Sequence, residues 1–226
     1  MVSFTFIMMA IIAGGFLLLT RVLPHVQPGY KRIIADLKLM RADMDKWLKD
    51  ELVPIDREEL ELVSLQQLHQ SVKKGTTLRA KGVFTTIYHE PVLAYSYKSY
   101  IASGKSALVY ARTATHEYAY WLRDKEIQVL IDGKLMGTLN KEGVLYNDQN
   151  RMIARINRTQ EDLAPVIVGE REVASVVKTQ VQRREMLSPR AFQFVKSDIT
   201  QEEEKIFLAL ATLELVEQSV PVKSTR

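Results

Sequence analysis

The sequence predicts a mainly β protein with helices: an N-terminal transmembrane helix, amphipathic connector helices, and an antiparallel β-barrel around a C-terminal hydrophobic helix. Residues 2–20 contain no charged side chain, hairpin-like units repeat between residues 129 and 176, and residues 206–213 are apolar on every side. The predicted segments are an anchor over 1–23, a helical connector over 24–76, a barrel domain with its core helix over 77–220, and a tail over 221–226.

The composition is that of a globular chain. Hydrophobic residues make up 46% and charged residues 26% of the 226 residues, which is ordinary for a folded domain. The chain has no cysteine, so disulfides, thiolate zinc sites and cysteine nucleophiles are excluded. The net charge of +4 suits an anionic membrane surface but is too small to indicate a nucleic-acid partner.

The first segment is long enough to cross a bilayer, since residues 2–20 would span ~28 Å as a helix. A cleaved signal peptide is the rival interpretation, but no basic residue precedes the apolar run and no small-x-small cleavage site follows it. Arg21, Lys31, Arg32 and Lys38 lie on the C-terminal flank. This asymmetry predicts a single-pass protein of the cell membrane with its N-terminus outside and its body cytoplasmic.

The connector is expected to form two helices, over residues 30–52 and 56–69. Three partners are open for an apolar seam on the first helix: another copy or a subunit of a membrane complex, the chain's own domain, or the membrane surface. The seam residues recur at alternating spacings of four and three, as in a coiled coil; they are Ile33, Leu37, Met40, Met44 and Trp47.

Strand patterns occupy the next part of the chain. Three similar units then follow, each with an apolar strand, a turn of Asp, Asn or Gly, and a second strand. Such turns supply the positive φ angles of tight hairpins, and repeated hairpins build a meander that curls into a barrel. The single strands are expected over 77–84, 91–100, 107–112 and 116–122, and the hairpin units over 129–139, 145–156 and 166–176.

The last predicted element is a helix that starts near residue 198. Thr200 and Glu203 have the spacing of a capping box. The apolar stretch of ~11 residues is too short to cross a bilayer, and a helix that is apolar all round is buried all round. We therefore expect this helix to fill the barrel and to end before Pro221.

The hairpin sequences DGKLMGTL and DQNRMIARI, followed by EEEKIFLALATLELV, resemble the tubby-like C-terminal superfamily, which includes LURP-one-related proteins and phospholipid scramblases. The resemblance covers residues 127–216 and implies a strand barrel around a central hydrophobic helix. Residues 82–121 are also similar to the extramembrane β-domain of GIDE-type membrane-anchored ligases, although no RING can follow without cysteine. An N-terminal anchor departs from the tubby proteins. No basic residues match their phosphoinositide-binding positions, so the resemblance carries no lipid specificity.

The sequence holds no catalytic signature, and we expect no enzymatic activity, cofactor or metal site. No two histidines have the spacing of a zinc-binding helix, and no EF-hand pattern occurs. Gly104-Lys105-Ser106 lacks the earlier glycine of a phosphate-binding loop. The histidines are His25, His69, His89 and His116.

Two groups of residues are candidate binding surfaces. Lys178, Arg183, Arg184 and Arg190 lie between the third hairpin and the last helix. This basic run is either a solvated loop or a surface for anionic lipid headgroups or a partner. An aromatic cluster is either strand packing or a membrane-facing or partner-facing surface. It comprises Tyr88, Tyr95, Tyr97, Tyr100, Tyr110, Tyr118, Tyr120 and Trp121.

The predicted function is therefore a membrane-anchored, non-enzymatic binding module that engages lipid headgroups or a protein at the cytoplasmic membrane face. The alternative is a structural accessory subunit of a larger membrane protein complex. Its partners would be the membrane itself, through anionic lipid, or other protein subunits.

Overall fold

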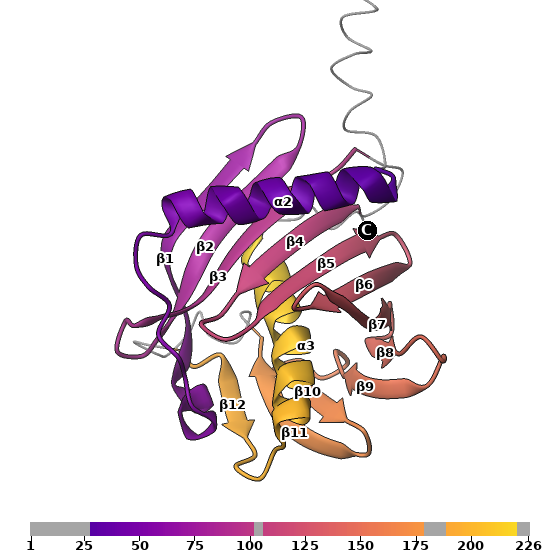
Figure 1. The fold of residues 1–226 in the computed structure, drawn as a ribbon. Coiled ribbons are helices and arrows are strands. Elements are labelled where there is room, and N and C mark those ends of the chain that lie inside the picture. Colours follow the sequence, from indigo (N-terminus) through magenta and orange to yellow (C-terminus); the bar gives the residue numbers. More distant parts are fainter. Residues whose placement is uncertain (1–27, 102–105, 179–188, 221–226) are drawn as a thin grey trace, which may run out of the picture.

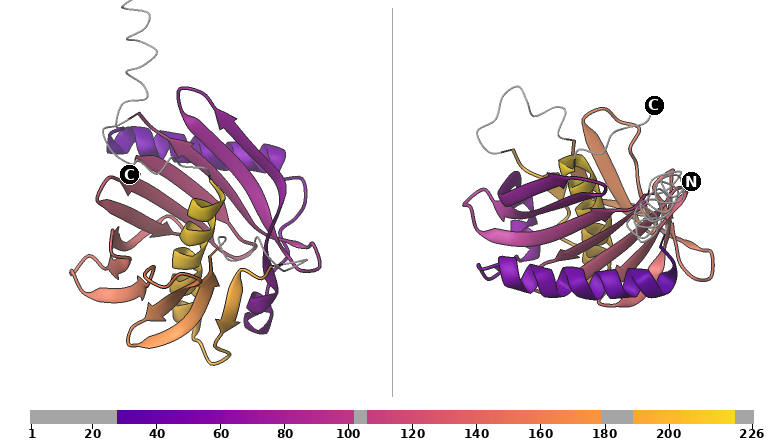
Figure 2. Two further views of the ribbon diagram at one scale, coloured as in Figure 1. Left: turned by 180° about the vertical axis from the view of Figure 1, so that it is seen from behind. Right: turned by 90° about the horizontal axis from the view of Figure 1, so that it is seen from above.

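The computed structural model describes residues 28–101, 106–178 and 189–220. In this part of the chain a twelve-stranded antiparallel sheet curls around the C-terminal helix α3, and helix α2 lies across the outside of the sheet (Figures 1 and 2). The predicted mainly β architecture, a barrel of antiparallel strands around a C-terminal hydrophobic helix, is confirmed.

In the described residues the chain enters the sheet after two helical segments, and twelve strands then precede the last helix. The elements are α2 (Tyr30–Trp47), the 3-10 helix η2 (Arg57–Leu62), β1 (Val63–Lys74), β2 (Leu78–Thr86), β3 (Pro91–Ser99), β4 (Ala107–Arg112), β5 (Glu117–Arg123), β6 (Glu126–Ile131), β7 (Lys134–Asn140), β8 (Val144–Tyr146), β9 (Met152–Ile156), β10 (Leu163–Val168), β11 (Arg171–Val177), β12 (Phe192–Val195) and α3 (Gln201–Ser219).

Each strand pairs with its neighbours in sequence, so the sheet is a meander. The two ends of the sheet meet where Ser64 forms an isolated antiparallel bridge with Arg190. The backbone N–H of Leu65 donates to the carbonyl of Pro189 at 2.8 Å, and that of Ala191 donates to the carbonyl of Val63 at 2.7 Å. These bonds bring the sheet close to full closure and leave few unpaired edge groups there.

The three predicted hairpin units are confirmed as β6–β7, β8–β9 and β10–β11. Asp132 and Gly133 have φ angles of 51° and 77°, and Asn150 has a φ of 57°. Gly169 turns the third hairpin with a φ of 62°. The turn residues thus supply the left-handed backbone that two tightly paired strands require.

Helix α3 begins with the predicted capping box. The backbone N–H of Glu203 donates to the Thr200 hydroxyl at 3.2 Å, and the Glu203 carboxylate accepts from the Thr200 N–H at 2.7 Å. Every residue of the helix from Ala209 to Val216 is buried, so this part is covered on every side. The Tyr120 hydroxyl donates to the Ala209 carbonyl at 2.6 Å, so even the polar tip of this core tyrosine is satisfied. Pro221 lies outside the described residues.

Helix α2 packs on the outer face of the sheet. Met44 is fully buried against Val83 and Tyr110, and Ile33 packs with Leu108 and Trp121. The apolar seam of α2 therefore packs on the chain's own domain, which is one of the three partners considered. Leu37, Met40 and Trp47 of the seam also pack against this outer face. Association with another copy or a membrane-complex subunit through these residues stays a prediction.

The second connector helix was predicted wrongly. Only Arg57–Leu62 is helical, as a 3-10 segment, and β1 starts at Val63. Gln67 and Leu68 pair with Phe84 and Val83 of β2, so a long-range ladder overrides the local helical pattern. The sheet therefore begins before residue 77.

No helix in residues 28–101, 106–178 and 189–220 is long and apolar enough to cross a membrane. The anchor predicted over residues 1–23 lies outside these ranges. It stays a prediction.

We expect Leu210→Asp to abolish folding, because Leu210 is 1% exposed at the centre of the barrel and a buried charge has no partner there. Leu210→Ala should lower the free energy of unfolding by ~2–5 kcal/mol. Thermal and urea denaturation would measure both. Glu202→Ala is the control on the same helix, since its side chain is 73% exposed. A native melting curve for Leu210→Asp would contradict the central position of α3.

Candidate functional site

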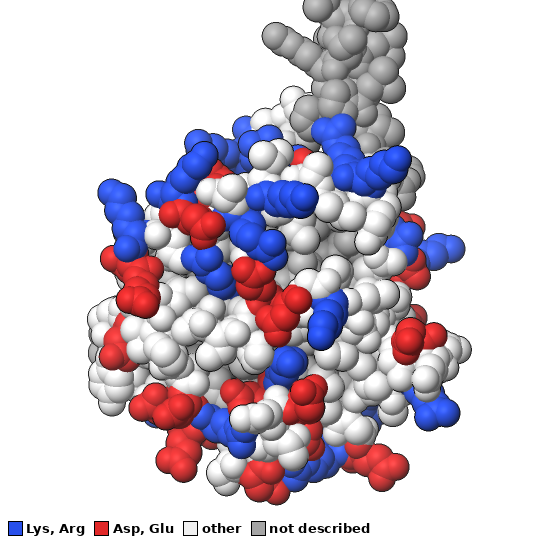
Figure 3. All heavy atoms as spheres, viewed as in Figure 1, with Lys and Arg blue, Asp and Glu red and all other residues white. Residues whose placement is uncertain are grey.

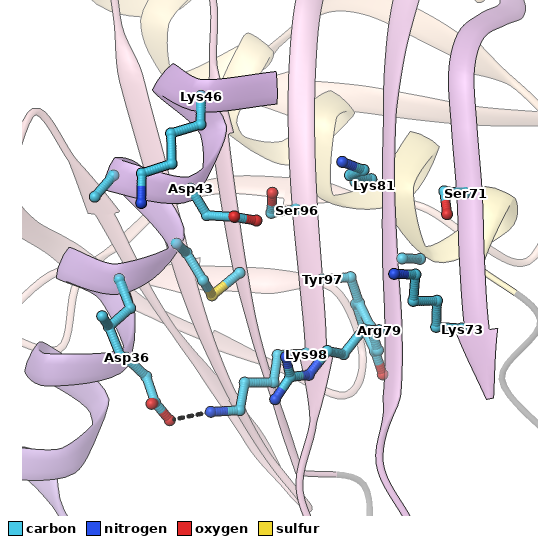
Figure 4. A pocket seen from close by; sticks show the side chains of 14 residues that line it. Asp36, Asp43, Lys46, Ser71, Lys73, Arg79, Lys81, Ser96, Tyr97 and Lys98 are labelled. Carbon is cyan, nitrogen blue, oxygen red and sulfur yellow. Dashed lines mark hydrogen bonds and ion pairs between the residues drawn. The ribbon is translucent and has the colours of Figure 1, made fainter. Parts of the chain in front are cut away.

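A groove of about 510 Å³ lies between α2 and the outer face of β1, β2 and β3 (Figure 4). Basic side chains outnumber acidic ones along it, and we call it the basic groove. The strands contribute serine hydroxyls and most of the cations, and α2 contributes both acids. Its polar lining is Asp36, Asp43, Lys46, Ser71, Lys73, Arg79, Lys81, Ser96, Tyr97 and Lys98.

Strand register explains why these side chains gather. Arg79 on β2 is directly opposite Lys73 on β1 and Lys98 on β3. Two residues further along β2, Lys81 is opposite Ser71 and Ser96. Because side chains alternate between the two faces of a strand, both rows lie on the same outer face. Like charges directly opposite one another destabilise a sheet, so the row of three cations has an energetic cost.

Asp36 relieves part of this cost. Its carboxylate accepts hydrogen bonds from the Lys98 ammonium at 2.7 Å and the Tyr100 hydroxyl at 2.6 Å, with Arg32 3.9 Å away. Burial by itself would raise the pKa of Asp36, but these hydrogen bonds and the charges of Lys98 and Arg32 outweigh it and hold the pKa below its ordinary value. Lys98 is therefore neutralised within the protein.

The other cations of the groove have no such neutralisation. Within the described ranges no ion pair involves Lys46, Lys73, Arg79 or Lys81. The Lys81 ammonium lies 4.7 Å from the ring centroid of Trp47, a cation–π contact that orients the charge without cancelling it. The basic groove thus carries net positive charge toward solvent.

Two further ion pairs fix α2 as the wall of the groove. The Arg41 guanidinium on α2 donates a hydrogen bond to the Glu117 carboxylate on β5. The Arg112 guanidinium on β4 donates to the Asp45 carboxylate on α2 at 2.7 Å. Together with Asp36 and Lys98, these pairs attach the helix at successive points along its length. The helix is therefore positioned by directional contacts as well as by its apolar seam.

The structure describes two of the four basic residues predicted as a binding surface, Lys178 and Arg190, and places them in different settings. The Lys178 ammonium donates to the carbonyls of Arg158, at 2.8 Å, and Gln160. The Arg190 guanidinium lies 3.9 Å from the Glu61 carboxylate. The backbone of Arg190 forms the bridge with Ser64 that brings the ends of the sheet together. Arg183 and Arg184 lie outside the described residues. Binding of lipid or a partner by these four residues stays a prediction.

Sequence reasoning missed the basic groove. The available signal was the Arg79-x-Lys81 alternation on a predicted strand, which puts both side chains on one face. That Lys73 and Lys98 flank Arg79 follows only from strand register, which no short motif encodes.

His25, Gly104 and Lys105 lie outside the described residues. In the aromatic cluster Tyr88 is exposed, and the other seven members are buried among the strands or under α2. The Asp132 carboxylate accepts hydrogen bonds from the His116 Nδ1–H at 2.9 Å and from the Glu117 N–H at 3.0 Å, and these bonds brace a turn. The described ranges hold no cluster of three residues able to ligate a metal.

Comparisons with family models, with curated proteins and with solved structures find no match to this chain. The resemblances to the tubby-like superfamily and to GIDE-type proteins therefore stay predictions. The basic groove is the feature of the described residues that bears on function.

We expect Asp36→Asn to lower stability at neutral pH by ~1–3 kcal/mol, since Lys98 loses a charge-assisted partner. The folded-state pKa of Asp36 lies below the ordinary value of 3.8. Its contribution is therefore complete above that value and is lost as the pH falls through the folded pKa. Urea denaturation should show the gap between the two proteins closing in that acidic range.

Asp43→Asn is the matched control, because Asp43 lines the same groove and no ion pair involves it in the described chain. It should show no comparable pH-dependent gap. Equal behaviour of the two variants would contradict the role given to Asp36.

Proposed function

We propose that the protein is a membrane-tethered, non-enzymatic binding module that engages anionic lipid headgroups at the cytoplasmic face through its basic surface. The observation that carries the proposal is the basic groove, whose cations Lys46, Lys73, Arg79 and Lys81 have no acidic partner in the described ranges. Such charge is expected on a surface that meets an anionic one.

The distribution of charge over the body supports this orientation. Figure 3 shows basic side chains gathered at the top of this face, over α2 and the adjoining strands, and acidic side chains mixed with basic ones over its middle and bottom. The basic end of this face suits an anionic bilayer. Each cation near such a surface contributes ~1 kcal/mol of attraction.

Chain connectivity points the same way. The predicted anchor ends at Leu23 and α2 begins at Tyr30, with only residues 24–29 between them. Even fully extended, the seven residue steps from Leu23 to Tyr30 reach no further than ~25 Å. If the anchor spans the bilayer, the start of α2 must therefore lie close to the headgroups. A tether of this kind raises the effective concentration of the basic surface at the membrane.

The first turns of α2 have the composition of an interfacial surface. Tyr30 is 65% and Ile34 39% exposed, and Lys31 and Lys38 are exposed at helical spacings of three and four from Ile34. These four side chains therefore share one face of the helix. Aromatic rings favour the headgroup region, and lysines add attraction to anionic lipid.

The first test uses a chain that lacks residues 1–27. We expect it to co-sediment with vesicles containing phosphatidylserine and not with phosphatidylcholine vesicles. Binding should fall as salt rises from ~0.1 M to ~1 M, because the screening length shrinks from ~10 Å to ~3 Å. Lys31→Glu with Lys38→Glu should weaken binding without lowering the melting temperature.

The matched control is Lys134→Glu with Arg151→Glu, which makes the same charge change on exposed residues at the hairpin turns β6–β7 and β8–β9. This variant should bind like the parent protein. Equal loss in both double variants would show that net charge, rather than a specific face, controls association.

The second test concerns topology. With the body cytoplasmic, protease added to intact cells should leave residues 28–226 uncut, and permeabilising the cells should expose them. Immunoblotting of a tag at the C-terminus would follow the cleavage. Digestion of the body in sealed cells would overturn the orientation.

A further inference from the structure

We infer that the basic groove is a binding site for a compact, multivalent oxyanion, a phosphate monoester carried by either a lipid headgroup or a free metabolite. This inference rests on the proposed function, because it assigns a ligand class to part of the same basic surface. Unlike general attraction to a membrane, it requires that binding depend on particular side chains inside the groove.

The cations of the groove are closely spaced. Lys73 and Arg79 face each other across adjacent strands, whose separation is ~4.8 Å, and Lys81 follows Arg79 on the same face at ~6.7 Å. Figure 4 shows Arg79, Lys81 and Lys73 on the strand wall and Lys46 on α2. The ~4.8 Å separation of their strands allows the Lys73 and Arg79 side chains to reach oxygens of the same phosphate group.

Arg79 is the central recognition group. Its planar guanidinium can donate two parallel hydrogen bonds to a phosphate, a geometry that an ammonium cannot reproduce. It lies between Lys73, which has no ion pair in the described chain, and Lys98, which Asp36 holds at 2.7 Å. A phosphate beside Arg79 would relieve the like-charge cost of this row.

The hydroxyls of the groove complete a polar cradle. Ser71 and Ser96 flank Lys81 in the second row, and neither side chain has a hydrogen-bond partner within the described ranges. Serine hydroxyls donate to phosphate oxygens and accept from ligand hydroxyls. They add specificity that a purely electrostatic surface lacks.

Charge balance favours a dianion over a monoanion. Lys46, Lys73, Arg79 and Lys81 stand against Asp43 alone once Asp36 is committed to Lys98. A phosphate monoester carries about −1.5 to −2 charges at pH 7. Asp43 on the α2 wall would repel a second phosphate placed against it, but it can accept a hydrogen bond from a hydroxyl. The groove therefore suits a phosphate monoester of a hydroxylated molecule.

The experiment uses the full chain in phosphatidylcholine nanodiscs. Isothermal titration with glycerol 3-phosphate at constant ionic strength should show saturable binding, and glycerol should show none. Arg79→Gln should weaken the affinity for glycerol 3-phosphate at least tenfold, and Lys73→Gln provides a second groove variant. Lys134→Gln removes a charge from the β6–β7 turn, outside the groove lining, and should leave the affinity unchanged. Thermal melts check that each variant is folded.

A second arm identifies the source of the phosphate. If nanodiscs containing phosphatidic acid abolish binding of the soluble ester, the groove takes a lipid headgroup. If binding of the ester is unchanged, the groove takes a free phosphate ester. Both results support the site, provided that the effect depends on Arg79.

The inference is overturned if wild type binds neither glycerol 3-phosphate nor phosphatidic acid in an Arg79-dependent way. It is also overturned if Lys134→Gln weakens binding as much as Arg79→Gln, since only diffuse charge would then be at work. Failure of vesicle co-sedimentation with intact binding of glycerol 3-phosphate would contradict the membrane proposal and support the groove as a site. The two proposals can thus fail separately.

Discussion

Burial of α3 is the constraint on which the rest of the structure depends. The helix is covered on all sides from Ala209 to Val216, so the sheet must surround it rather than lie on one face. A meander of twelve antiparallel strands does this, and the bonds between Val63–Leu65 and Pro189–Ala191 bring its ends together. Because α3 fills the interior, the proposed ligand site lies on the outer face.

The outer face is shared between α2 and exposed strand residues. The helix is seated by Met44 and Ile33 and by three ion pairs, of which the pair of Asp36 and Lys98 is the most buried. Ion pairs that lose water gain little net stability, but they are directional. They therefore set where α2 crosses the sheet, and this placement leaves the strand face around Arg79 and Lys81 uncovered beside it.

Elements specified by contiguous residues were predictable from the sequence. Thr200 and Glu203 marked the start of α3, the all-round apolar run marked its burial, and Asp132-Gly133 marked a hairpin. The second connector helix failed because residues 63–69 carry a helical pattern that pairing with β2 overrides. The groove could not be predicted from the sequence for a related reason. Its residues come from one helix and three strands, and the register that aligns them is a property of the assembled sheet.

Lys98 joins the groove to the helix that leads toward the predicted anchor. Lys98 lies in one row with Arg79 and Lys73, and its ammonium forms an ion pair with Asp36 of α2. An anion bound beside Arg79 would compete with Asp36 for this ammonium while relieving repulsion within the row. A ligand that prefers one position of α2 must, by linkage, be bound more tightly in that position. If the groove binds an anion as proposed, the pair of Asp36 and Lys98, which lowers the cost of the empty groove, would couple its occupancy to the contact between α2 and the sheet.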